Sequence, residues 1–281
     1  MNNILSIDVE EYFHANNIQK YSPINTWDNL ESRVEASTYK ILESLEKKDT
    51  TATFFVLGYI AKKHNKLVRD ISDAGHEVAS HGNMHQLVYE QSQKEFYEDI
   101  LTAKKILEDT IGKEIKGYRA PSFSINDSTN WAYETLVQAG YEYDSSLYPV
   151  WHPRYANTGK NPNPHFVNTK SGKLKIYPLA TAKLLEKRLP IAGGAYWRLL
   201  PFNYIKWGMK QKRECSVYYF HPWEIDPEQP RYEQLGFLTK YRHYGKSNVF
   251  LNKIENILDL FSFKSFESIA VKDKTANDKN S

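Results

Sequence analysis

The sequence predicts an α/β fold, a (β/α) barrel of about seven parallel strands with its helices outside. Short runs of β-branched and aromatic residues alternate with longer segments that carry apolar residues at helical spacing. The 281 residues are enough for one such barrel. A flat doubly wound sheet is the alternative. The turns after the strands lack the glycine-rich phosphate motif of a dinucleotide fold, which disfavours that form.

Each element is predicted from its local pattern. Strands are expected at the short apolar runs, residues 3–9, 51–57, 76–80, 115–118, 141–143, 175–179, 216–220 and 263–269. Helices are expected where apolar residues recur every three to four positions, at 30–47, 61–74, 92–111, 126–139, 201–212 and 247–260. Gly75, Gly112 and Gly140 end three of them, because glycine adopts the left-handed conformation of a helix C-terminus. Ser92 with Glu95 predicts a capping box at the start of the third helix.

We interpret residues 1–270 as a single catalytic domain. The stretch 149–172 is rich in Pro, Asn and Gly, so a long irregular insertion is expected there. Residues 271–281 are polar and are expected to form a disordered tail.

Composition narrows the class of protein. The net charge of +3 is small and no arginine-rich run is present, so nucleic acid is not an expected partner. The single cysteine, Cys215, excludes an intrachain disulfide and a thiolate metal cluster. The N-terminus lacks the basic start and apolar stretch of a signal peptide, and no segment reaches the roughly 18 apolar residues of a transmembrane helix. A cytoplasmic location, free or peripheral to the inner membrane, is therefore expected, with the oligomeric state open.

Ionisable residues stand at the ends of five predicted strands. They are Asp8 and Glu10, His81, Arg119, Asp144 and His221. The carboxyl ends of parallel strands form one shared mouth, where the active sites of such folds are built. The sequence therefore predicts a single site that draws on five segments.

Two of these segments have the pattern of a metal site. His81 and His85 are four residues apart and can converge on one ion, with a carboxylate of the cluster at 8–11 as third ligand. Two histidines and one carboxylate are usual for a catalytic zinc ion. Asp8 and Glu10 point to the same face of a strand, so one can bind metal while the other accepts a proton from water. The alternatives are structural histidines and acids that begin a helix.

Three motifs make a family resemblance specific: His-Gly-Asn-Met-His at 81–85, Tyr-Arg-Ala-Pro-Ser at 118–122 and Tyr-Tyr-Phe-His-Pro at 218–222. Their order and spacing over residues 3–225 resemble the polysaccharide deacetylase (NodB-homology) family. The sequence 221–231 looks like the branch found with bacterial exopolysaccharide genes. The resemblance implies a distorted (β/α) barrel, a divalent metal that is usually Zn²⁺, and hydrolysis of N-acetyl groups on an amino-sugar glycan.

The resemblance also implies roles by matching motifs. The implied metal ligands are Glu10, His81 and His85; the implied catalytic residues are the general base Asp8, its partner Arg119 and the general acid His221. The family's first motif has two adjacent aspartates, whereas here Val9 separates the acids. The carboxylate ligand therefore stays open between Glu10 and Glu11.

Three further residues are expected to meet the substrate. The backbone N–H of Ser122 is expected to hold the oxyanion, and Trp223 to stack on a sugar ring. Asp144 is expected to orient His221 or to line the cleft.

Two other functions remain open. A metal-dependent amidohydrolase of small cyclic or linear amides would use the same groups, although the many aromatic residues, 14% of the chain, favour a glycan. A carbohydrate-binding module with a decayed site is disfavoured, because every expected catalytic residue type is present.

Overall fold

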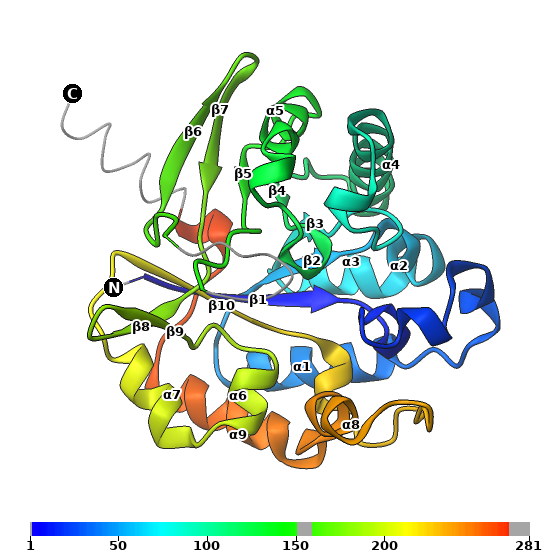
Figure 1. Ribbon diagram of the computed structural model, residues 1–281. Helices are drawn as coiled ribbons and strands as arrows, with labels where there is room; N and C mark the ends of the chain where they lie inside the picture. The colour runs from blue at the N-terminus through cyan, green and yellow to red at the C-terminus, as the bar shows by residue number, and fades with distance from the viewer. Residues whose placement is uncertain (1, 151–158, 270–281) are drawn as a thin grey trace.

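A computed structural model describes residues 2–150 and 159–269. Within them, eight strands form one sheet in the order β10-β1-β2-β3-β4-β5-β7-β6 (Figure 1). The strands are β1 (Asn2–Val9), β2 (Thr53–Val56), β3 (Glu77–Ser80), β4 (Gly117–Tyr118), β5 (Tyr143–Asp144), β6 (His165–Thr169), β7 (Gly172–Ile176) and β10 (Cys215–Phe220). Neighbouring strands are parallel except β6 and β7. The predicted parallel sheet is therefore confirmed, with one antiparallel strand added at its edge.

The sheet curls until its two sides meet. The segment after β7 reaches β10, where Leu179 forms an isolated parallel bridge with Val217. The amide of Ala180 donates to the carbonyl oxygen of Val217 at 2.9 Å. Because an isolated bridge stands here in place of a full ladder, the barrel is distorted, as expected.

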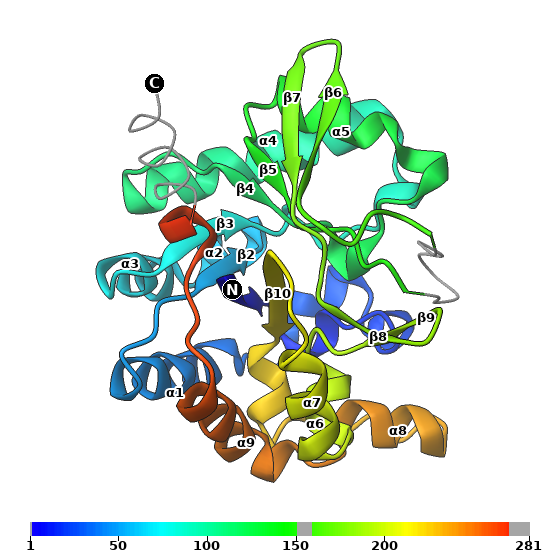
Figure 2. The same cartoon turned by 90° about the vertical axis from the view of Figure 1, so that its left-hand side faces the viewer.

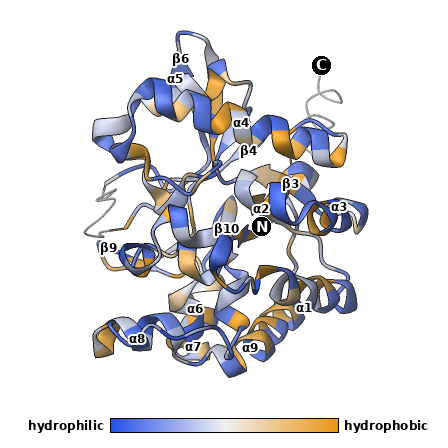
Figure 3. Cartoon of the chain, turned by 90° about the vertical axis from the view of Figure 1, so that its right-hand side faces the viewer, coloured by the Kyte–Doolittle hydropathy of each residue, from blue (hydrophilic) through white to orange (hydrophobic). Residues whose placement is uncertain are grey.

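The helices cover the outside of the barrel (Figures 1 and 2). They are α1 (Val34–Lys47), α2 (Gly58–Lys63), α3 (Asn65–Asp73), α4 (Gln93–Ile111), α5 (Trp131–Gln138), α6 (Ala195–Leu199), α7 (Phe202–Met209), α8 (Phe237–Tyr244) and α9 (Ser247–Leu260). Many carry both hydrophilic and hydrophobic residues, as helices that cover a core with one face do (Figure 3). Within the described ranges, none is long and apolar enough to cross a membrane.

Side chains of β1 alternate between two layers. Leu5 and Ile7 belong to the main core that also holds residues of α1. Ile4 points the other way and joins Phe55 and Val217 in a second apolar cluster. Since alternate residues of a strand share a face, Asp8 lies on the side of Ile4. The inner face of β1 is thus apolar near its start and acidic at its carboxyl end.

Several predicted elements need correction. The predicted helix at 61–74 is two helices, α2 and α3, because His64 between them is non-helical (φ −125°, ψ 51°). The stretch 149–172 is not wholly irregular, since it contains β6. The strand predicted at 263–269 is wrong: Lys264 forms a bridge with Ile4, and residues 266–269 are helical. Its buried apolar residues stand at 263, 266 and 269, a spacing of three rather than two.

Other elements were not predicted. They are the two-stranded antiparallel sheet of β8 (Thr181–Leu184) and β9 (Lys187–Pro190), and the helices α6 and α8. The tail predicted at 271–281 lies outside the described residues.

Candidate active site

The carboxyl ends of the central strands bring the predicted residues together. Glu10 directly follows β1, His81 follows β3, Arg119 follows β4 and His221 follows β10. The register pairs Ile7 of β1 with Phe220, the last residue of β10. The residues that follow them, Asp8 and His221, therefore lie at the same level of the sheet.

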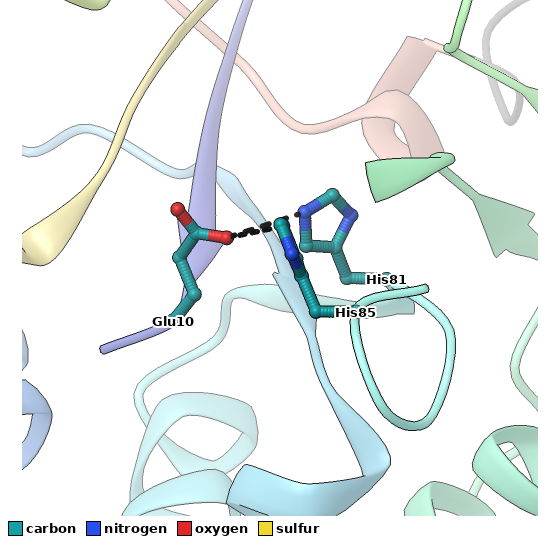
Figure 4. A group of neighbouring side chains, drawn as sticks. All are labelled: Glu10, His81 and His85. Carbon is teal, nitrogen blue, oxygen red and sulfur yellow. Dashed lines mark ion pairs between the residues drawn. The ribbon is translucent and has the colours of Figure 1, made fainter. Parts of the chain in front are cut away.

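Glu10, His81 and His85 form a buried cluster (Figure 4). Their nearest ligand atoms all lie within 4.8 Å of one another. Glu10 Oε2 is 2.7 Å from His85 Nε2 and 3.8 Å from His81 Nε2. Among the described residues, the only groups close to the buried Glu10 Oε2 are these two imidazoles, and neither makes a well-aligned hydrogen bond to it. A buried carboxylate oxygen beside two imidazoles is the donor set that a divalent cation would satisfy.

The imidazole of His81 and the carboxylate of Glu10 have the protonation states that binding of a cation requires. His81 Nδ1 lies 2.8 Å from the carbonyl oxygen of Arg119, which can only accept, so Nδ1 carries the proton and the Nε2 lone pair faces Glu10. Burial lowers the pKa of His81 to about 4, so its ring is neutral at pH 7. Burial alone would raise the pKa of Glu10, but the nearby His85 and His221 hold it well below its usual value.

Glu11, the other candidate ligand, points to a different set of partners from Glu10. Its carboxylate accepts from the backbone N–H of Arg33 at 3.0 Å and of Val34 at 3.2 Å, and from the hydroxyl of Ser32. These are free amides at the start of α1, so Glu11 fixes the N-terminus of that helix. The carboxylate beside the histidines is that of Glu10.

Asp8 is held by Arg119 in a fully buried ion pair. Arg119 Nη1 lies 2.6 Å from Asp8 Oδ1, and the same nitrogen donates to the hydroxyl of Ser6 at 2.8 Å. The rest of the guanidinium donates to the carbonyl and hydroxyl oxygens of Ser145, both at 3.0 Å. The ring of Phe55 lies 4.1 Å from the guanidinium carbon. These contacts leave Asp8 Oδ2 as the oxygen that faces His221.

His221 closes the site and is its most accessible side chain. Its Nε2 lies 4.0 Å from Asp8 Oδ2 and 3.6 Å from Glu10 Oε1, and its side chain is 18% exposed. Its Nδ1 lies 3.0 Å from Glu224 Oε2, and Arg198 Nε is bound to the other oxygen of Glu224 at 3.2 Å. Burial opposes a charge on His221, but Glu10, Glu224 and Asp8 together raise its pKa to about 9. His221 is therefore protonated at neutral pH.

The sequence analysis did not identify Glu224 as the partner of His221 and expected Asp144 to orient that histidine or to line the cleft. Asp144 is completely buried, and its carboxylate accepts from the amide and the hydroxyl of Ser146. Burial raises its pKa to about 6. It therefore neither orients His221 nor lines a cleft. The signal for Glu224 was its place three residues after His221, in the turn that begins with Pro222.

Trp223 and Ser122 are the other two residues that were expected to meet the substrate. Trp223 is 9% exposed, and the rings of His221 and His243 lie against it at centroid distances of 4.9 and 4.5 Å, nearly parallel to it. The expectation that it stacks on a sugar is wrong, because both faces of its indole are covered. Ser122 follows β4 beside Pro121 and has φ +51°, in the left-handed region, as has Phe123 at +57°. Its part in catalysis stays a prediction.

Two families match the chain in succession. Residues 19–143 match the polysaccharide deacetylase family, and residues 145–271 match a domain of unknown function, DUF3473. The first match contains His81, His85 and Arg119, whereas His221 and Glu224 lie in the second.

Curated relatives carry related names. The chain is 30% identical over 126 residues to a peptidoglycan deacetylase of Helicobacter pylori, covering 44% of this chain and 42% of that protein. It is 32% identical over 144 residues to a peptidoglycan-N-acetylglucosamine deacetylase of Bacillus cereus, covering 50% and 64%. The chain thus spans less than two thirds of either relative.

Solved structures match almost the whole chain. A candidate polysaccharide deacetylase from Mycobacterium smegmatis superposes with a TM-score of 0.66 at 18% identity, covering 98% of this chain and 91% of that one. A family 4 carbohydrate esterase from Streptomyces lividans, solved with acetate, gives 0.52 at 15% identity, covering 94% and 91%. These likenesses establish the fold that the two proteins share with this chain.

Proposed function

We propose that the chain, whose residues 19–143 match the polysaccharide deacetylase family, is a metal-dependent hydrolase that removes N-acetyl groups from an amino-sugar polysaccharide or oligosaccharide. The observation that carries the proposal is the convergence of Glu10, His81 and His85, with Asp8 and His221 beside them. A metal site flanked by one carboxylate base and one cationic acid is suited to hydrolysis of an amide.

The residues present fit a divalent cation, and we propose Zn²⁺. One carboxylate oxygen and two imidazole nitrogens match the open, three-ligand site of catalytic zinc, and the lack of a well-aligned hydrogen bond to the buried Glu10 Oε2 is a further argument. When bound, the ion supplies a Lewis acid that polarises the acetyl carbonyl and lowers the pKa of a water molecule.

Asp8 is the proposed general base. Arg119 binds one of its oxygens at 2.6 Å and keeps the carboxylate ionised and fixed. The other oxygen takes a proton from water as that water attacks the acetyl carbon. The backbone N–H of Ser122 is the proposed donor to the oxyanion that forms.

His221 is the proposed general acid. Its proton on Nε2 is delivered to the nitrogen of the leaving amine, so that the carbon–nitrogen bond breaks and acetate departs. Glu224 on Nδ1 holds the ring and favours its charged form, while Arg198 fixes Glu224. The proposed acid is thus charged and is the most accessible side chain of the site.

The substrate class follows from the relatives as a proposal. The two curated relatives are named for deacetylation of peptidoglycan, whose N-acetyl groups stand on amino sugars. The motif at 221–231 favours an exopolysaccharide or its oligosaccharide precursor. Both classes present the same acetamido group to the site.

The test combines metal binding with acetate release. Purified protein is titrated with Zn²⁺ and assayed on chitin oligomers, peptidoglycan fragments and exopolysaccharide fragments. We expect one zinc ion per chain, lost in His81→Ala, and acetate release that falls about 100-fold or more in Asp8→Asn and His221→Ala. His165→Ala, on β6, serves as the control that keeps both properties. Folded, zinc-loaded protein that releases no acetate from any glycan would contradict the proposal.

A further inference from the structure

The two oxygens of Glu10 have different partners. The indole N–H of Trp223 donates to Oε1 at 3.0 Å, whereas Oε2 faces the two histidines. Glu10 and Trp223 are both buried, so this hydrogen bond to a charged group is shielded from water. A carboxylate bound in this way has one oxygen engaged before any cation arrives.

The indole is fixed on both faces. His221 lies against one face at 4.9 Å and 19°, and His243 against the other at 4.5 Å and 9°. The indole therefore cannot turn away from Glu10 without displacing an imidazole.

His243 is itself locked to the same turn. Its Nε2 lies 2.9 Å from Gln229 Oε1, and Gln229 Nε2 donates to the carbonyl oxygen of Trp223 at 2.7 Å. Burial lowers the pKa of His243 to about 3, so a neutral ring backs the indole. α8 and the turn after β10 thus act together to hold one N–H group in place.

We propose that Trp223 is a positioning residue that fixes Glu10 so that Oε2 alone reaches the cation. The inference rests on the proposed function, since it takes Glu10, His81 and His85 as the metal ligands. Hydrogen-bond partners behind a ligand set its orientation, and their loss commonly weakens metal binding 10- to 100-fold. Without this N–H, Glu10 is free to rotate and to offer both oxygens to the ion.

The decisive variant is Trp223→Phe, which keeps a flat ring between the two histidines but removes the donor. We expect its affinity for Zn²⁺, measured by competition with a chelating dye, to fall about 10- to 100-fold. With Co²⁺ as the probe, the visible absorption should weaken, because a second carboxylate oxygen raises the coordination number. Trp207→Phe, on α7 and 37% exposed, is the matched control and should change neither reading.

The outcomes separate this inference from the proposed function. Zinc affinity within twofold of wild type and an unchanged Co²⁺ spectrum in Trp223→Phe would overturn the role of Trp223. Zinc binding that survives His81→Ala would instead overturn the metal site itself. If Trp223→Phe does not fold, wild-type protein with ¹⁵N-labelled tryptophan replaces it. One of the slowly exchanging indole N–H signals should shift on addition of Zn²⁺, and the absence of a shift in all six tryptophan signals would refute the inference.

Discussion

Replacing Arg119 by Met should destabilise the protein by about 3–5 kcal/mol. The guanidinium is completely buried and donates to Asp8, Ser6 and Ser145. Methionine retains the flexible stem against Phe55 but none of the donors. The loss is large because Asp8, 2% exposed, would remain a buried charge without its hydrogen-bonded cation, with only His221 at 4.0 Å as a more distant one.

Urea unfolding of the metal-free protein, followed by circular dichroism, measures this loss. A double-mutant cycle of Arg119→Met with Asp8→Asn isolates the interaction between the two side chains. The double variant should recover part of the lost stability, with a coupling energy of about 1–3 kcal/mol. Lys47→Met is the control, because its ion pair with Glu43 is exposed, and no measurable change is expected. A loss below about 1 kcal/mol in Arg119→Met, or zero coupling, would refute the reasoning about this pair.

Three further predictions concern other carboxylates and one histidine. Glu224→Gln should lower the pKa of His221, so the alkaline limb of the rate profile should move by about 1 pH unit or more to lower pH; an unmoved limb would speak against their coupling. Glu11→Gln should lower the free energy of unfolding by about 1 kcal/mol and leave Zn²⁺ affinity unchanged in calorimetry, whereas Glu10→Gln should abolish zinc binding. Burial lowers the pKa of His76 to about 4 in the folded protein, from 6.5 in the unfolded chain. The contribution of the neutral ring to the free energy of unfolding is therefore complete above pH 6.5 and is lost as the pH falls to 4. His76→Gln should therefore remove about 3 kcal/mol of acid sensitivity between these pH values, as urea unfolding at each pH would reveal.

Elements with signals at both ends were predictable from sequence. α4 begins at the capping box of Ser92 and ends at Gly112, whose φ is 66°. The convergence of the residues at the strand ends was also predictable, because parallel strands must place their carboxyl ends on one side of the sheet. Local pattern and sheet topology were sufficient to group Asp8, Glu10 and His221.

The relations that sequence could not supply depend on packing between distant elements. Arg198 reaches Glu224 from α6, a helix that was not predicted. The covering of Trp223 depends on His243 of α8, twenty residues further on. An aromatic residue beside a catalytic histidine suggests a sugar platform until its other face is known. Periodicity also misled at 263–269, where a spacing of three was taken for alternation.

The pairing of β1 with β10 has a consequence for biosynthesis. Asn2 is in register with Cys215, so the strand that carries Asp8 lies against one made more than two hundred residues later. On the ribosome, one edge of β1 cannot pair until residues 215–220 of β10 have been made. Contacts of such high sequence separation slow folding, and unpaired strand edges invite aggregation. Nascent chains released before residue 221 should therefore lack both the closed barrel and His221, the proposed acid.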